Sequence, residues 1–429
     1  MTNQKNPVAL VQVLVEGYRS CRKTEFSPNS ELSALIGING SGKTNLLTAI
    51  RLLAVQSRRR YGVPTDKESS LNETTVTAWF LVDDVRIGYR IRLFLSVSSK
   101  NTDEVVAMSE EWNFQGITKS RIWRAIPASV LLGSPKDHDI RYVMDIERYE
   151  RQLYESRKHS VANFANPGYF TDDVTTNEAV ISSVGRVFDF CRRITYYGAS
   201  QFTDPSRCPS SFEIESDGRL TDTYGISRAH AKFLHDLYSL RRDNLDLYEV
   251  YEQFISRNEL GLISRLTWKE VQLSSNVAEV KSGGTFKKVR KYKTLIIPKI
   301  QIGQSHITFN QLSEGTFKTL AMVFYIMTDA SSCLLIEEPE VCVHLGLLSR
   351  IVGTIKSYSK SKQVIFSTHS DQVLDQLTPE NVFVVAMTRS GTTTTDMKSW
   401  VGQKGRAALT SYLEESGTLG EYWRAGGLA

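Results

Sequence analysis

The chain has 429 residues, of which 52 are Lys or Arg and 47 are Asp or Glu, so the formal net charge is +5. Hydrophobic residues make up 41% and charged residues 23% of the chain, ordinary values for globular domains that exclude a mainly disordered, collagenous or rod-like protein. The small positive charge permits nucleic-acid binding but does not argue for it, because dedicated binders cluster their basic residues. At about 150 residues per domain, the length fits two to three domains or one large domain with an insertion.

Cysteine usage and hydropathy indicate the compartment. The five cysteines are scattered and form no Cys-x-x-Cys pair, which predicts a reducing environment and disfavours zinc. The first 20 residues lack the long apolar core of a signal peptide, and no run of about 18 apolar residues occurs anywhere in the chain. We therefore expect a cytoplasmic protein.

The first part of the chain predicts strands, a loop and a helix. Residues 8–36 are expected to form two strands separated by a polar turn, and the second strand runs into a Gly-rich loop. Residues 43–56 have apolar residues at helical spacing. Residues 74–98 are rich in β-branched and aromatic residues around an Asp-Asp pair, which predicts antiparallel strands. Residues 145–159 are expected to form an exposed helix.

The rest of the chain changes from mixed elements to a regular alternation. Residues 192–200 predict a buried strand, residues 226–262 predict helical structure, and residues 267–309 predict a hairpin or meander. From residue 311 onward the order is helix, strand, helix, strand. That alternation is typical of parallel strands joined by crossover helices.

The Gly-rich loop fits the pattern G-x-x-x-x-G-K-[ST], with the residues Gly37, Ile38, Asn39, Gly40, Ser41, Gly42, Lys43 and Thr44. Glycines let backbone N–H groups converge on phosphate oxygens, and the N-terminus of the following helix adds a favourable dipole. In this pattern Lys43 reaches the β- and γ-phosphates and the Thr44 hydroxyl ligates Mg²⁺. The alternative is a tight strand-to-helix turn without a ligand.

The segment CLLIEEPE (333–340) is an apolar strand that ends in two carboxylates. Together with a phosphate loop it is a Walker B candidate, although acidic residues at the end of a strand are common by themselves. Adjacent strand residues point to opposite sides, so Glu337 and Glu338 should not share one task. We expect Glu337 beside the Mg²⁺ and Glu338 beside the attacking water, because phosphoryl transfer depends mostly on positioning and electrostatics.

Two further segments follow the pattern of a nucleotide site. In QLSEGTFKTLAM (311–322), Ser313 is a plausible N-cap with Gly315 in the first turn, so this helix start is either a second anion site or an ordinary capped helix. In QVIFSTHS (363–370), a buried strand ends at His369. One crossover helix separates it from the carboxylate strand, which places His369 near the same sheet edge.

The chain contains, in this order, the phosphate loop and the segments LSEGT, LLIEEPE and STHS. In this order of motifs it resembles the head of an ABC-type ATPase of the RecF/SMC/OLD superfamily. The narrower resemblance is to the AAA15/AAA21-like ATPases of bacterial anti-phage systems such as PARIS or Septu. It implies ATP and Mg²⁺ as ligands, ATP hydrolysis, and a dimer that encloses two nucleotides. It also implies a separately encoded effector, such as a nuclease or toxin, as partner.

The resemblance assigns further roles to residues. Ser313 and Gly315 would contact the nucleotide bound to a second copy of the chain, and His369 would be the switch histidine. Arg19, in the first β-turn, and Asn45, after the phosphate loop, would lie at the phosphates. Gln201 would be the Q-loop ligand of the metal, together with Thr44 and Glu337. Residues 341–344 occupy the D-loop position.

The resulting fold class is α/β: an ABC-type ATPase head with a mixed, largely parallel core sheet, antiparallel strands in the first lobe and a largely helical insertion. The expected division is 1–56 for the N-terminal half of lobe I with the phosphate loop, 57–300 for antiparallel strands and insertion, 301–390 for lobe II, and 391–429 for a C-terminal tail. No long heptad run separates residues 45 and 310, so no coiled-coil arm is expected. The tail lacks the carboxylate cluster of a Toprim nuclease.

Other functions remain open at this stage. A RecF-like repair ATPase would clamp duplex DNA when ATP closes the dimer, and a non-hydrolysing scaffold would use ATP only as a structural ligand. The basic stretches 57–61 and 286–293 could contact a phosphate backbone or form solvated surface. No helix-turn-helix or zinc motif indicates sequence-specific DNA reading.

Overall fold

The computed structural model describes residues 8–57, 72–97, 103–115, 178–221, 228–256, 259–280, 286–415 and 417–426. They fall into two compact units, of which the first comprises Met1–Gly198, Ala330–Pro339 and Ile355–Ala429, and the second comprises Ala199–Asp329 and Glu340–Thr354. The predicted helix at 145–159 and the basic residues 58–61 lie outside the described residues.

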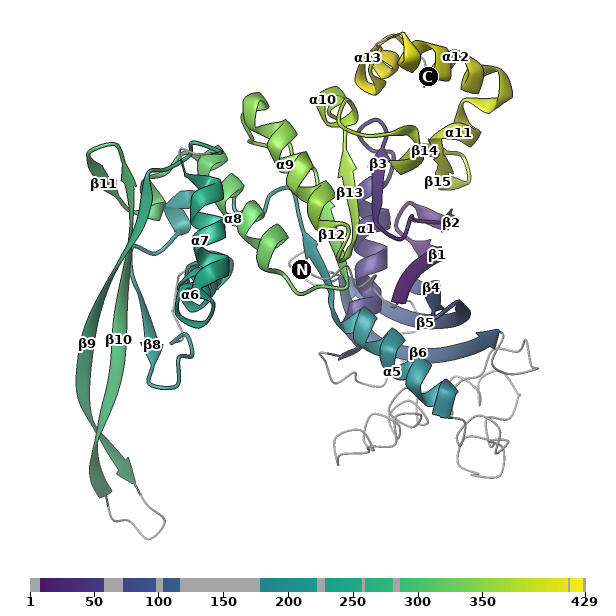
Figure 1. Ribbon diagram of the computed structural model, residues 1–429. Coiled ribbons are helices and arrows are strands. Elements are labelled where there is room, and N and C mark those ends of the chain that lie inside the picture. The colour runs from purple at the N-terminus through teal and green to yellow at the C-terminus, as the bar shows by residue number, and fades with distance from the viewer. Residues whose placement is uncertain are drawn as a thin grey trace, which may run out of the picture. The chain divides into compact units, whose positions relative to one another are not determined.

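The first unit contains a five-stranded antiparallel sheet in the order β2-β1-β4-β5-β6 (Figure 1). Its strands are β1 (Val8–Tyr18), β2 (Cys21–Phe26), β4 (Asn72–Val82), β5 (Val85–Val97) and β6 (Asp103–Gln115). The expected turn joins β4 to β5: Asp83 and Asp84 both have positive φ, as a two-residue hairpin loop of matching twist requires.

One predicted polar turn is wrong, because residues 21–26 form the edge strand β2. A hairpin turn at Arg19 and Ser20 sets Tyr18 opposite Cys21, and β2 pairs with β1 along its length. The sequence CRKTEF looks polar because β2 buries only Cys21, Thr24 and Phe26. Edge strands tolerate such composition, since one side is open to charged side chains.

The second sheet of this unit has the order β15-β14-β3-β13-β12-β7, and all neighbours are parallel except the antiparallel pair β14 and β15. Its strands are β3 (Leu32–Ile36), β7 (Ile194–Tyr197), β12 (Cys333–Glu337), β13 (Gln363–Thr368), β14 (Val382–Thr388) and β15 (Gly391–Asp396). Strands β3 and β13 are buried throughout, as central parallel strands are.

Helices of the first unit pack on these sheets or follow them. They are α1 (Lys43–Arg51), α5 (Glu178–Arg192), α10 (Asp371–Leu374), α11 (Met397–Trp400), α12 (Gly402–Glu414) and α13 (Leu419–Arg424), with 3₁₀ turns at Leu52–Ser57 and Pro379–Asn381. The apolar face of α1, with Leu46, Leu47 and Ile50, lies in the core that also contains β1, β4 and α5. Burial of this face fixes the start of α1, where the phosphate loop ends.

The second unit combines helices with an antiparallel β-sheet built on a long ribbon. Strands β9 (Arg265–Val280) and β10 (Phe286–Ile302) pair along most of their length, and β8 (Phe212–Glu215) and β11 (Ser305–Ile307) pair with β10 (Figure 1). The ribbon is the expected hairpin, and it adds a large β component to the expected helical insertion.

The helices of the second unit are α6 (Arg228–Asp243), α7 (Leu245–Ile255) and α8 (Glu314–Thr328), with 3₁₀ turns at Pro205–Arg207 and Phe309–Gln311. The helical stretch predicted at 226–262 is divided at Asn244, whose side chain caps α7. Helix α8 is buried from Phe317 to Met327 in an aromatic core that includes Phe202, Phe233 and Phe309. Helix α9 (Leu345–Tyr358) begins in the second unit and ends in the first. Among the described residues, no helix combines the length and the apolar character that crossing a membrane requires.

Candidate nucleotide-binding site

The glycine-rich loop joins the buried strand β3 to α1, as the sequence predicts. Gly42 is the N-cap of α1 with a φ of +102°; it provides no side-chain cap, and no acidic residue lies in the first turn. The first N–H groups of α1 therefore receive no acceptor from the cap residue. Such a helix start is suited to bind an anion.

Two features of the loop fit a phosphate. A Cβ added to Gly40 would meet no atom within 4 Å, so the loop surface is open at this residue. The Ser41 hydroxyl is buried and has no hydrogen-bond partner among the residues that the structure describes. An open glycine and a buried polar atom without a partner both fit a loop that receives a polar ligand.

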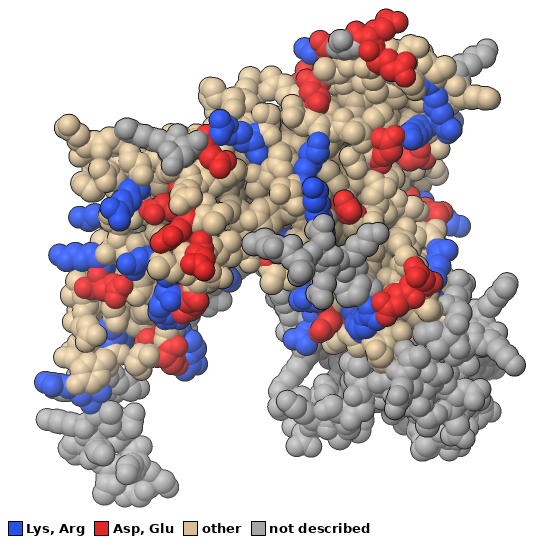
Figure 2. All heavy atoms as spheres, viewed as in Figure 1, with Lys and Arg blue, Asp and Glu red and all other residues tan. Residues whose placement is uncertain are grey.

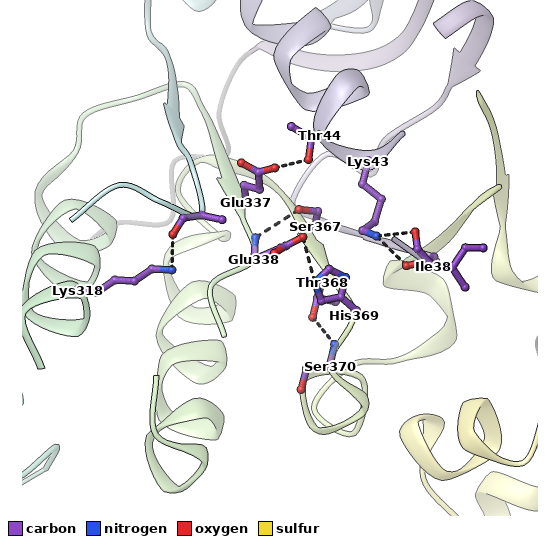
Figure 3. A network of polar contacts seen from close by, with 12 residues as sticks. Ile38, Lys43, Thr44, Lys318, Glu337, Glu338, Ser367, Thr368, His369 and Ser370 are labelled. Atoms are coloured by element: carbon purple, nitrogen blue, oxygen red, sulfur yellow. Dashed lines mark hydrogen bonds and ion pairs between the residues drawn. The ribbon is translucent and has the colours of Figure 1, made fainter. Parts of the chain in front are cut away.

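Lys43 is buried and bends back over the loop. Its Nζ donates to the carbonyl oxygen of Gly37 at 2.7 Å and to that of Ile38 at 3.3 Å (Figure 3). These acceptors are neutral carbonyls, which bind an ammonium group less strongly than anions do. A phosphate group at the loop would therefore compete well for Lys43.

Glu337, at the end of β12, lies at the start of α1. The Thr44 hydroxyl donates to its Oε1, and the Tyr196 hydroxyl donates to its Oε2 at 2.7 Å. Burial raises the pKa of Tyr196, and the neighbouring Glu337 raises it further. Mg²⁺ prefers oxygen ligands and uses few of them from a protein, so a hydroxyl and a carboxylate in contact fit this ion. In the described parts of the chain, no group of three or more His, Cys, Asp or Glu residues is arranged to hold a metal ion.

Tyr196 was not predicted. It lies in β7, a neighbour of β12 in the sheet, where Ile336 of β12 pairs with Tyr197. The sequence gives only a weak signal, a Tyr-Tyr pair at the end of a short strand before Gly198. The partner Glu337 is 141 residues away, so only the strand order reveals the contact.

Glu338 has a different environment from Glu337, but not through strand alternation, because β12 ends at Glu337. The φ of Glu338 is +45°, and its N–H donates to the Ser367 carbonyl oxygen at 3.0 Å. Its carboxylate oxygen Oε1 lies 3.0 Å from Nε2 of His369, at the end of the neighbouring strand β13 (Figure 3). A residue with positive φ that is not glycine is uncommon and marks a backbone held by its surroundings.

Arg19 and Asn45 lie together beside the loop. Arg19 is exposed in the β1–β2 turn with a φ of +49°, and its Nη1 donates to Oδ1 of Asn45 at 3.4 Å. The side-chain amide of Asn45 donates to the Ser20 hydroxyl at 2.7 Å. The contact connects the β1–β2 turn to the first turn of α1.

Ser313, Gly315 and Gln201 belong to the second unit. The Ser313 side chain accepts a hydrogen bond from the N–H of Thr316, so it caps α8 as expected. A Cβ on Gly315 would lie 2.1 Å from the carbonyl oxygen of Cys342, which leaves no room for a side chain. Gln201 follows Ala199, whose carbonyl oxygen accepts a hydrogen bond from Nζ of Lys318 in α8 at 2.8 Å. The trans-contact and metal-ligand roles of these three residues stay predictions.

The mixed α/β fold and the matching family model identify an ATPase-type domain of the AAA class. The chain belongs to the family described as "AAA domain, putative AbiEii toxin, Type IV TA system", whose model matches residues 32–173 and 236–375, more than half of the chain. A comparison with curated proteins finds no match.

Solved structures with similarity to this chain include three heads of SMC proteins. One is the Smc head bound to the C-winged helix domain of ScpA, with 12% identity, a TM-score of 0.46, and coverage of 90% of this chain and 97% of the other. The Smc head with an extended coiled coil from Pyrococcus furiosus has 13% identity, a TM-score of 0.44, and coverage of 95% and 99%. The head from Thermotoga maritima has 12% identity, a TM-score of 0.40, and coverage of 91% and 99%.

Proposed function

We propose that this protein binds ATP with Mg²⁺, hydrolyses it, and uses the cycle to close and open a dimer of two chains. Two contacts next to the glycine-rich loop support the proposed ATP cycle most directly. Thr44 contacts Glu337, and His369 contacts Glu338. The loop itself is followed by Lys43, which bends back over it. These contacts support the proposal because they connect the phosphate loop and the start of α1 to the two acidic residues at the end of β12.

Each residue has a task in this proposal. Lys43 leaves the carbonyl oxygens of Gly37 and Ile38 and binds the β- and γ-phosphates, which are stronger acceptors. Thr44 and Glu337, with Gln201, would hold Mg²⁺, which supplies positive charge to the phosphate oxygens. Glu338 orients the attacking water. His369, whose Nε2 lies 3.0 Å from the Glu338 carboxylate, stabilises the charge that develops on the γ-phosphate in the transition state.

A second copy of the chain would complete the site with Ser313 and Gly315. Ser313 is the N-cap of α8, so a neighbouring γ-phosphate would meet a helix start with its favourable dipole. Hydrolysis removes the group that both copies bind and so releases the dimer. ATP therefore acts as a switch.

We assign this switch to an anti-phage system in which a separately encoded effector, such as a nuclease or toxin, is controlled. The description of the matching family names a putative toxin of a type IV TA system, which supports a place for this chain in a system that has a toxic component. The RecF-like alternative has no specific support. In the second unit, acidic side chains are interspersed with basic ones on the face shown in Figure 2, and Lys293 of the predicted basic stretch pairs with Glu213.

A hydrolysis assay and a phage assay test the proposal. The wild-type chain should hydrolyse ATP only with Mg²⁺, and Lys43→Ala should neither bind nor hydrolyse it. Tight ATP binding by Lys43→Ala would overturn the phosphate-loop assignment. The phage assay uses cells that also carry the gene of the separately encoded effector. The wild-type chain should lower the number of phage plaques in these cells, and Lys43→Ala should not. ATP-dependent, salt-sensitive binding to duplex DNA without any phage phenotype would favour the repair alternative.

A further inference from the structure

Two parts of the nucleotide site pack on residues near the end of the chain. We call β14, β15 and α13 the C-terminal segment. Strands β14 and β15 lie against the phosphate loop, and α13 lies against α10, which begins directly after His369. No chemical role is predicted from the sequence for residues 391–429.

The phosphate loop touches both strands of the C-terminal segment. A Cβ added to Gly37 would lie 2.2 Å from the carbonyl oxygen of Val385 in β14, and one added to Gly42 would lie 2.0 Å from Oγ1 of Thr392 in β15. Real Cβ atoms do not approach other atoms this closely. Gly37 and Gly42 must therefore be glycines, because β14 and β15 leave no room for a side chain at these two positions.

Thr392 is only 1% exposed and makes several hydrogen bonds at this contact. Its hydroxyl lies 2.8 Å from the Ser20 hydroxyl and 3.1 Å from the Ser41 carbonyl oxygen, and it can donate to either. Its N–H donates to the Ser20 carbonyl oxygen at 2.8 Å, and its own carbonyl accepts from Thr24 at 2.6 Å. Thr392 thus has a fixed position beside the loop.

The contact with the Ser41 carbonyl has a consequence for phosphate binding. The peptide unit is planar and trans, so the Ser41 carbonyl and the Gly42 N–H point in opposite directions. A hydrogen bond that holds the carbonyl toward Thr392 therefore aims the Gly42 N–H away from β15. This N–H is one of the loop donors that a phosphate would use.

Helix α13 fixes α10 in a similar way. The Gly420 N–H donates to Oδ1 of Asp375 at 2.9 Å, and a Cβ on Gly420 would lie 2.2 Å from the Asp371 carbonyl oxygen. Nε of Arg424 pairs with Oδ2 of Asp371 at 3.1 Å. The N-cap of α10 is Ser370, the residue after His369, so a shift of α10 would move His369 relative to Glu338.

We propose that the C-terminal segment is a positioning element of the ATPase site, in which Thr392 prepares the phosphate loop for ATP and α13 holds His369 beside Glu338. The proposal rests on the ATPase function proposed above and adds a way to regulate it. A partner that displaces α13 would lower turnover without lowering the affinity for ATP.

The test separates affinity from turnover in two sets of variants, each with its own control. Thr392→Val removes the hydroxyl and keeps the shape; Thr393→Val removes a neighbouring hydroxyl that bonds to Ala386 in β14 and serves as control. Gly420→Val forces α13 off α10, and Arg424→Gln is the milder variant. Arg406→Gln in α12 is its control, because Arg406 donates to the Lys398 carbonyl oxygen and interacts electrostatically with Asp396. Kd is measured with a fluorescent ATP analogue, and kcat at saturating ATP.

We expect Thr392→Val to raise Kd about three- to tenfold, the range that one net hydrogen bond corresponds to, with kcat within twofold of wild type. Gly420→Val should lower kcat about tenfold and Arg424→Gln less, both with wild-type Kd. The two controls should match wild type in both constants.

Wild-type Kd in Thr392→Val, or wild-type kcat in both α13 variants, would overturn the proposal. If Gly420→Val does not fold, Arg424→Gln decides alone. Equal effects of Thr392→Val and Thr393→Val would also contradict it. Absence of ATP binding by the wild-type chain would overturn the proposed function as well, whereas normal wild-type activity with unaffected variants would overturn only this inference.

Discussion

The contact between Gly42 and Thr392 predicts a strong non-additivity between substitutions at these two residues. Gly42→Ala places a Cβ 2.0 Å from Oγ1 of Thr392 at a φ of +102°. The backbone conformation costs an L-residue about 1–2 kcal/mol, and displacement of Thr392 adds about 1–3 kcal/mol of overpacking. We therefore expect the free energy of unfolding to fall by about 3 kcal/mol in total.

Thr392→Ala alone should cost about 1–2 kcal/mol through its lost buried hydrogen bonds. It also removes the two Thr392 atoms that the new Cβ meets and leaves the Ser20 hydroxyl at 2.8 Å, which can rotate away. The double variant should therefore retain mainly the backbone strain and the lost hydrogen bonds. Its cost should be about 3 kcal/mol instead of the additive sum of about 5 kcal/mol, a coupling of about 2 kcal/mol.

Urea denaturation of the four proteins measures this coupling, provided the m values agree. Gly40→Ala is the matched control, because its φ is also positive, at +79°, but its Cβ would meet nothing within 4 Å. In that background Thr392→Ala should be additive. Equal effects of Thr392→Ala in the Gly40→Ala and Gly42→Ala backgrounds would refute the reasoning.

Three further predictions follow from single residues. Lys43→Met should abolish the rise in unfolding temperature that ATP causes, because its ammonium group is the main cation of the loop; an unchanged ATP-induced shift would contradict this. Tyr196→Phe removes the donor to Oε2 of Glu337, so fluorescence-detected nucleotide binding should need several-fold more Mg²⁺, and an unshifted Mg²⁺ titration would count against this contact. The hydrogen bond with Asp236 raises the pKa of His235, so this pair stabilises the fold fully below about pH 6.5 and loses its effect as the pH rises through the raised pKa. His235→Gln should therefore lower the unfolding temperature at pH 5.5 and leave it nearly unchanged at about pH 9, whereas equal losses at both pH values would refute the assignment.

The sequence reveals those parts of the site that are local. The residues Gly37 to Thr44 follow an apolar strand and begin an amphipathic helix. This short pattern predicts a phosphate-binding loop. Glu337 and Glu338 follow an apolar run, which predicts their place at the end of a strand. Strand geometry does not account for Glu338, because β12 ends at Glu337 and Glu338 has a φ of +45°. The Asp83-Asp84 turn is equally local, and the structure has it as predicted.

Contacts between distant segments are not visible in the sequence. Thr392 lies in a run of four threonines without a motif, and its partner Ser41 is 351 residues away. Tyr196 contacts Glu337 only because β7 and β12 are neighbours in the sheet. Strand β2 was missed because an edge strand does not need the apolar composition that identifies a buried strand.

The central claim is that Glu338 orients the water that attacks ATP. Glu338→Gln keeps the size of the side chain, removes its charge and replaces one acceptor oxygen by an NH₂ donor. Turnover of ATP by this variant, measured together with its mass by light scattering, tests the claim most directly. We predict hydrolysis at least about a hundredfold slower than wild type, as expected for loss of such a group, and a stable dimer that retains ATP. Hydrolysis at the wild-type rate would contradict the claim.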